Sequence, residues 1–190
     1  MFVVAVVLAA AVSTAPSNPP LVFDAALDVG LPTFASPGFG ARLRFGQEGR
    51  PFRLGLTLNA GTLPNFAAEQ FFESTADIES LTVQWDYAVS LDLEVVAWSR
   101  SWIEVFGRGS FGYESWDVTL EDESVRIFNN YVSVALGATI FPIEDVPFFV
   151  DLSFSGIVLF GQEDAYALGD DEVELRSFAT NPSVSLGWRF

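Results

Sequence analysis

Hydrophobic and polar residues alternate along most of the chain from Leu21 onward. Between residues 80 and 97, for example, Val89, Leu91 and Leu93 occupy every second position, with small or polar residues between them. Side chains of a β-strand point alternately to its two faces, so a period of two predicts strands rather than helices. The pattern predicts eight strands, which cover residues 21–30, 38–46, 52–62, 80–97, 102–116, 127–141, 147–160 and 177–190.

The predicted connections are short at one end of the strands and longer at the other. The short ones cover residues 47–51, 99–101 and 142–147, and the longer ones cover residues 31–37, 63–79, 117–126 and 161–176. Barrels of the bacterial outer membrane have this layout, with short periplasmic turns and long outer loops. An even number of strands also returns the C-terminus to the end at which the first strand begins.

The two faces of the predicted strands differ in side-chain size. One parity carries Phe, Leu, Trp and Tyr, whereas the other carries Gly, Ser and Ala together with charged residues. The lumen of an eight-stranded barrel has little room for large side chains, and lipid imposes no such limit. We therefore expect the large apolar residues to face lipid, in an all-β, eight-stranded antiparallel up-and-down transmembrane β-barrel. The alternative is a soluble, lipocalin-like barrel with the apolar residues around a ligand.

Aromatic residues gather near the ends of the predicted strands, as they do at the two interfaces of membrane barrels. The predicted aromatic girdle comprises Phe45, Phe52, Trp98, Trp102, Phe141 and Phe148 beside the short turns, and Tyr113, Trp116 and Phe160 toward the other end.

Charged residues on the small-residue parity predict a charge network in the lumen. The acids are Asp24, Asp28, Asp86, Asp92, Glu94, Glu104, Glu114 and Asp151, and the bases are Arg42, Arg44, Arg53 and Arg108. Buried charges must be paired or hydrogen-bonded, and an arginine binds carboxylates through two N–H groups at once. Because the acids outnumber these arginines, we expect some acids to be protonated, hydrated or near the mouths.

The N-terminal residues 2–12 form an uncharged apolar run, and Ser13, Ala15 and Pro16 follow it. The run is too short to span a bilayer as a helix, and small residues after such a run are typical of a signal peptide. We expect residues 1–15 to be a signal peptide, although no Lys or Arg precedes the run, and residues 16–190 to form the barrel. A buried N-terminal strand or helix is the alternative.

Composition narrows the function classes. The formal net charge of −16 argues against nucleic acid as a partner, because its phosphates would be repelled. The chain has no Cys, which excludes disulfides and thiolate metal sites, and no His, which excludes a Ser–His–Asp triad. Carboxylates such as Asp92, Glu94 and Glu104 could act as an acid–base pair, but pairing with arginine is the favoured interpretation. We predict no enzymatic activity and no cofactor.

The last eight residues end the final predicted strand with Leu186, Trp188 and Phe190 at alternate positions. This ending resembles the C-terminal assembly signal of outer-membrane barrels, and the whole pattern resembles the small OmpA/OmpX-type barrel family. The resemblance implies a place in the bacterial outer membrane, contact with its lipid, and insertion by the barrel-assembly machinery through the last strand. We expect a monomeric barrel standing alone, without a peptidoglycan-binding domain.

The longer connections are rich in acids. They carry Glu69, Glu73, Asp77, Glu79, Asp117, Glu121, Asp122, Glu123, Glu163, Asp164, Asp170, Asp171, Glu172 and Glu174. Clustered carboxylates attract divalent cations, so such ions are candidate partners, but a solvated and repulsive loop surface is the favoured interpretation. Phe66, Phe71 and Phe72 are unusual for a solvated loop, and are expected either to dip into the interface or to continue a strand above it.

Three functions remain open at this point. The favoured one is a structural or surface-interaction barrel with a closed polar lumen and acidic extracellular loops. The second is a narrow cation-preferring channel or small-solute uptake port, against which the side-chain-filled lumen of an eight-stranded barrel argues. The third is the soluble ligand-binding barrel.

Overall fold

The computed structural model describes residues 21–30, 39–47, 49–63, 65–143, 145–163 and 165–190. The expected signal peptide and the connection at residues 31–37 lie outside the described residues. Within the described part, no helix is long and apolar enough to cross a membrane.

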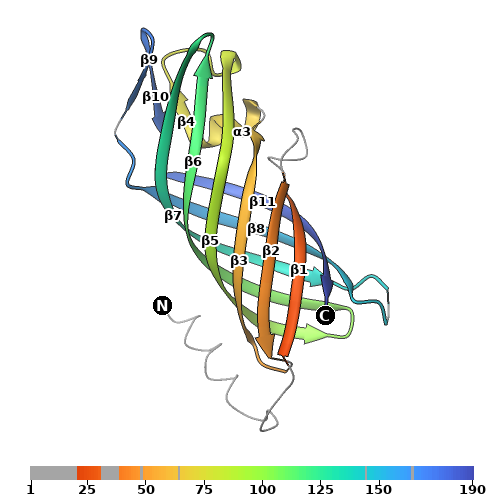
Figure 1. Cartoon of the computed structure of the whole chain (residues 1–190). Coiled ribbons are helices and arrows are strands. Elements are labelled where there is room, and N and C mark those ends of the chain that lie inside the picture. Colours follow the sequence, from red (N-terminus) through yellow and green to blue (C-terminus); the bar gives the residue numbers. More distant parts are fainter. Residues whose placement is uncertain (1–20, 31–38, 48, 64, 144, 164) are drawn as a thin grey trace.

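Eight strands form one closed antiparallel barrel (Figure 1), and β1 pairs with the last strand to close it. The strands are β1 (Leu21–Gly30), β2 (Phe39–Gln47), β3 (Phe52–Leu63), β5 (Leu81–Arg100), β6 (Ile103–Leu120), β7 (Glu123–Ile140), β8 (Phe148–Phe160) and β11 (Phe178–Arg189). The expected fold class is confirmed, and most strand ends lie within one or two residues of the prediction.

The largest difference is at the predicted connection 117–126, which is mostly strand. β6 continues to Leu120 and β7 begins at Glu123, so only a tight turn separates them. Glu121 in that turn has a positive φ of 53°. The acidic residues 121–123 therefore lie at the tip of a long hairpin rather than in an irregular loop.

Two other long connections also fold. The first contains α3 (Asn65–Phe71), β4 (Phe72–Ser74) and the 3-10 helix η1 (Ile78–Ser80), and the second contains β9 (Tyr166–Leu168) and β10 (Asp171–Leu175). β10 pairs with both β4 and β9, which gives a small three-stranded sheet. We call these five elements the cap. In Figure 1 the cap lies beside the extended ends of β5, β6 and β7, at the end of the barrel opposite the C-terminus.

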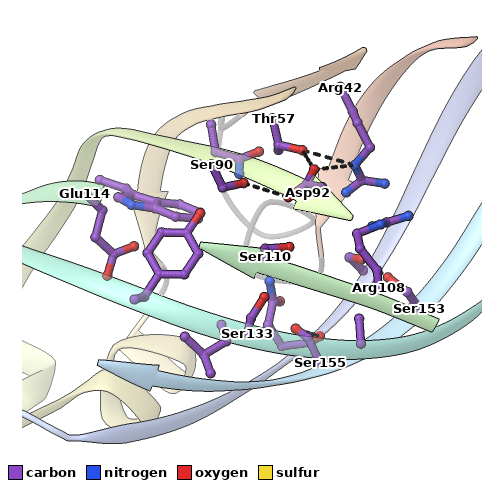
Figure 2. A pocket seen from close by; sticks show the side chains of 17 residues that line it. Arg42, Thr57, Ser90, Asp92, Arg108, Ser110, Glu114, Ser133, Ser153 and Ser155 are labelled. Carbon is purple, nitrogen blue, oxygen red and sulfur yellow. Dashed lines mark hydrogen bonds and ion pairs between the residues drawn. The ribbon is translucent and has the colours of Figure 1, made fainter. Parts of the chain in front are cut away.

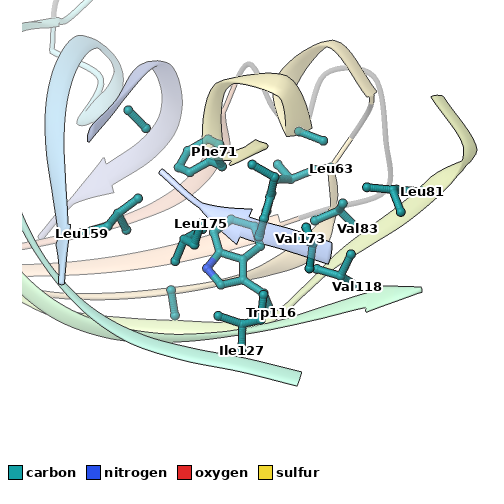
Figure 3. Close-up of a cluster of buried hydrophobic side chains, with 14 of the residues drawn as sticks. Leu63, Phe71, Leu81, Val83, Trp116, Val118, Ile127, Leu159, Val173 and Leu175 are labelled. Carbon is teal, nitrogen blue, oxygen red and sulfur yellow. The ribbon is translucent and has the colours of Figure 1, made fainter. Parts of the chain in front are cut away.

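A hydrophobic core joins the cap to the barrel wall, with Trp116 at its centre (Figure 3). The ring centroids of Phe71 and Phe72 lie 5.4 Å from that of Trp116. Trp116, Phe72 and Val173 are fully buried, with 0% of their surface exposed. The prediction that Trp116 belongs to the aromatic girdle is therefore wrong. Its position on β6 has the same parity as the inward-facing Glu114, so its side chain points into the core.

A β-bulge in β5 changes which residues of that strand face inward. The register with β6 shifts between Trp85 and Tyr87, so Asp86 is the extra residue. Leu81 and Val83 are consequently buried in the cap core, although they share their parity with the outward-facing residues of the same strand. The bulge allows one strand to serve two interiors of different polarity.

The outer surface of the barrel is apolar. Its exposed residues include Leu54, Leu91, Phe111, Val134, Leu136 and Phe154. Among the predicted girdle residues, Phe45, Phe52, Trp98, Trp102, Tyr113 and Phe160 are exposed, and Phe148 is half-buried. Phe141 differs from the prediction, because it is half-buried with its ring 6.2 Å from that of the inward-facing Phe149.

Glycines on the inner face make room for aromatic rings in the lumen. Gly137 lies directly opposite Phe106 on the neighbouring strand, and Gly187 lies opposite Phe149. A Cβ added at Gly137 would lie 2.5 Å from the Phe106 ring, and one at Gly187 would overlap the Phe149 ring. Both rings are almost completely buried. Many small residues on the inner parity are therefore explained by the few large rings that they accommodate.

We expect Gly137→Ala to destabilise the folded barrel by about 1–3 kcal/mol, because the added methyl group overpacks the lumen. It would meet both the Phe106 ring and the backbone oxygen of Leu152 at 2.5 Å. Gly109→Ala is the matched control, because nothing lies within 4 Å of its Cβ position. Urea unfolding in detergent micelles, followed by tryptophan fluorescence, measures both variants. Equal urea midpoints for Gly137→Ala and Gly109→Ala would contradict the argument that Gly137 makes room for the Phe106 ring.

Candidate functional site

A cluster of ion pairs fills the lumen near the end where the short turns lie. It contains five arginines and five carboxylates, from every barrel strand except β7: Arg42, Arg44, Arg53, Arg108, Arg189, Asp24, Asp92, Glu94, Glu104 and Asp151. We call this set the lumenal ion-pair cluster. Among the side chains that the structure describes, the cluster has equal numbers of positive and negative groups.

Arg44 lies at the centre of the cluster and is only 2% exposed. Its guanidinium group contacts Asp151 at 2.9 Å, Glu94 at 3.2 Å and Asp24 at 3.2 Å. These carboxylates belong to three different strands, and each is 1% exposed. The guanidinium group also lies over the ring of Phe149, 4.9 Å from its centroid, which adds a cation–π contact.

The remaining arginines share the same carboxylates. Glu94 accepts hydrogen bonds from Arg108 at 2.9 Å and from Arg53 at 3.3 Å. Arg53 also binds Glu104, with 2.7 Å between the closest atoms. Every carboxylate in this part of the cluster therefore has at least one guanidinium partner.

Arg189 is a member of the cluster that the sequence prediction missed. It binds Asp24 through two nitrogens, at 2.8 and 3.1 Å, and Glu104 at 2.9 Å. The signal was present in the sequence, because Arg189 alternates with the outward-facing Trp188 and Phe190. With Arg189 counted among the lumenal arginines, the expected excess of acids over arginines in the lumen is smaller.

Three predicted network residues lie outside the cluster. Asp86 pairs instead with Arg126, at 3.2 Å, in a partly exposed position at the bulge, so its assignment to the lumenal network is wrong. Asp28 pairs through its backbone with Ser185, but its side chain lies outside the described residues. Glu114 faces the interior and is 3% exposed, but it has no arginine partner among the described residues.

A polar cavity of about 100 Å³ lies between the cluster and the cap (Figure 2). Arg42, Asp92 and Arg108 line one end, where Thr57 and Ser90 donate hydrogen bonds to Asp92 at 2.5 and 3.0 Å. The rest of the lining includes hydroxyl and amide groups, among them those of Ser110, Ser133, Ser153, Ser155, Asn59 and Asn181. Figure 2 shows Glu114 at the opposite end from Arg108. The cavity is partly open rather than sealed.

The charged groups of the cluster and cavity are arranged for binding and charge pairing. Among the described residues, no group of three or more carboxylates is arranged to hold a metal ion. Within the described part, the acidic cap residues therefore form no group of three or more that could hold the candidate divalent cations.

Several solved outer-membrane proteins share this fold. The N-terminal β-barrel domain of OprF from Pseudomonas aeruginosa superposes with a TM-score of 0.54 at 13% identity, over 92% of this chain and 100% of that chain. Neisserial surface protein A gives a TM-score of 0.52 at 12% identity, over 90% of this chain and 96% of that one. A major outer membrane protein from Thermus thermophilus gives 0.54 at 13% identity, over 90% and 100%.

No protein-family model matches the sequence, and no curated protein sequence matches it. The likeness to solved structures is therefore one of fold. The chain has the fold of the small eight-stranded outer-membrane barrels, of the OmpA/OmpX type. Its large exposed apolar exterior is the surface expected of a barrel that faces lipid, whereas a soluble ligand-binding barrel would place these residues inside. The fold defined here is that of an outer-membrane β-barrel, with a charged, side-chain-filled lumen.

We expect Glu94→Gln to destabilise the barrel by about 3–5 kcal/mol, because the change leaves buried guanidinium groups without their shared carboxylate. Arg44, Arg53 and Arg108 all contact Glu94. Glu123→Gln removes the same charge at an exposed position and serves as the control. Urea unfolding in detergent micelles reports the difference. A Glu94→Gln midpoint equal to that of the control would show that the cluster does not stabilise the fold.

Proposed function

We propose that this chain is a closed, non-conducting and monomeric outer-membrane barrel that presents the cap at the cell surface, in a structural or surface-interaction role. The supporting observation is that the lumen is filled at one end by the lumenal ion-pair cluster and covered at the other by a folded cap. Side chains commonly fill the lumen of eight-stranded barrels, which also supports a non-conducting barrel.

The orientation follows the usual arrangement of such barrels. The short turns and the C-terminus lie at the end that carries the cluster, which corresponds to the periplasmic side. The cap then faces outward. Its outer surface is strongly acidic, with exposed residues that include Glu69, Glu73, Asp77, Glu79, Glu163, Asp170, Glu172 and Glu174. A rigid core beneath this surface suits presentation to other molecules better than a disordered loop would.

A narrow cation-preferring channel is the second candidate, and the cavity between the cluster and the cap is the observation that favours it. Conduction would require the cluster to rearrange, because Arg44 and Arg108 contact carboxylates across the lumen. The proposal includes no catalytic activity, because the chain has no His and the cluster carboxylates are bonded to arginine.

Planar-bilayer recording tests the closed lumen. We expect the purified barrel to give no current steps above the lipid background in molar potassium chloride. The current through Arg44→Ala, which lacks the central cation of the cluster, is recorded under the same conditions and compared with that of the unmodified protein. Regular, cation-selective steps from the unmodified protein would reject the closed-barrel proposal in favour of the channel.

Deletion of Phe190 tests the proposed interaction with the barrel-assembly machinery. In the folded barrel the Phe190 N–H donates to the Phe23 carbonyl oxygen at 2.7 Å, and its side chain is 70% exposed. We expect the truncated protein to be exported but to insert poorly into the outer membrane. Fractionation and heat-dependent gel mobility measure export and insertion separately. Normal insertion of the truncated protein would contradict the terminal-signal interpretation.

A further inference from the structure

The buried carboxylate of Glu114 lacks the positive partner that the other deeply buried acids of the lumen have. It accepts hydrogen bonds from Asn129 Nδ2 at 2.8 Å and from Trp116 Nε1 at 3.0 Å. Both donors are neutral. All nine basic residues of the chain are described, and none forms an ion pair with Glu114. Removing a carboxylate from water without a cationic partner is costly, so the ionised form of Glu114 is favoured at this position when a positive ligand binds.

The charge of the interior around Glu114 also favours a positive ligand. The lumenal ion-pair cluster contains equal numbers of arginines and carboxylates, so it supplies no spare positive charge to the cavity. The cap core on the other side is hydrophobic. When it is ionised, Glu114 therefore adds one negative charge that no arginine compensates, and a single monovalent cation would neutralise it.

The walls beside Glu114 are aromatic. Trp85 and Tyr131 line the same cavity, and Trp85 stacks on Trp116 with 5.2 Å between ring centroids and an angle of 5°. The faces of Trp and Tyr rings attract cations, and ammonium groups are commonly held between such rings and a carboxylate. A metal ion would require several oxygen ligands instead, and no group of three metal-binding side chains is present among the described residues.

The size and polarity of the cavity limit the ligand further. A volume of about 100 Å³ is less than that of an engineered cavity of about 150 Å³ that admits benzene, so a molecule of a few heavy atoms fits. The cavity lining includes serine hydroxyls, which would hydrogen-bond to a polar substituent of the ligand. Its partly open form provides a route of entry.

We propose that the cavity is a binding site for a small organic ammonium ion, whose charged group contacts Glu114 between Trp85 and Tyr131. This inference does not rest on the proposed function, because an internal ligand is compatible with either a closed or a conducting barrel.

Binding is tested on the purified barrel in detergent micelles, with methylammonium chloride as the probe and sodium chloride holding the ionic strength constant. Isothermal titration calorimetry gives the affinity, and tryptophan fluorescence gives a second signal because Trp85 and Trp116 lie beside the site. We expect saturable binding to the unmodified protein, and at least about tenfold weaker binding to Glu114→Gln, since a buried charge pair is lost. Glu123→Gln, which removes an equal charge at the exposed hairpin tip, should bind as tightly as the unmodified protein.

A comparison of probes keeps the test decisive if Glu114→Gln does not fold. Ethanol has a similar size but no charge, so the unmodified protein should give no saturable response to it at the same concentrations. Absence of saturable methylammonium binding, or an equal response to ethanol, would overturn the proposal. Equal weakening by Glu123→Gln would also overturn it, because general surface charge would then account for the binding.

Discussion

The guanidinium group of Arg44 is buried in the lumen, and its three carboxylate partners come from three other strands. A charge in this position costs several kcal/mol unless it is fully paired, so the barrel is favoured only when all four strands lie in register. A slip of β2 by one residue would exchange Arg44 with Leu43, which places the charge in lipid and the apolar side chain among carboxylates. The ion pairs therefore select the register that the apolar exterior also requires.

The same strands pass through two environments of opposite polarity. Within the membrane the outside is apolar and the inside is charged, whereas beside the cap the inside is the apolar core. β6 keeps the same alternation in both environments. Its inner face carries Arg108 and Glu114 in the lumen, and the next inner positions are Trp116 and Val118 in the cap core. β5 meets the two environments differently, through the bulge at Asp86. The change in solvent along the barrel axis explains why the inner face forms an apolar core only beside the cap. In the lumen the large inner rings of Phe106 and Phe149 lie against guanidinium groups instead.

This change of environment also marks how far the sequence could predict the structure. The period of two located all eight barrel strands, because lipid outside and a small lumen inside impose strict alternation. The hairpin beyond residue 116 was interpreted as a loop, because Trp116 and Val118 place apolar residues on the parity that holds charges elsewhere. The bulge at Asp86 leaves no local sequence signal. Arg189, in contrast, could have been assigned to the lumen, because it alternates with the outward-facing residues of its strand. The cap depends on pairing between β4 and β10, which are far apart in the sequence.

Glu114 lies where these two interiors meet. On one side every carboxylate is matched by an arginine, and on the other the side chains carry no charge to match. A purely structural role for this position would be served as well by glutamine, which would keep polar contacts with Asn129 and Trp116 without a buried charge. A carboxylate here, facing a polar cavity with aromatic walls, is therefore better explained by a positive ligand than by the packing of the barrel.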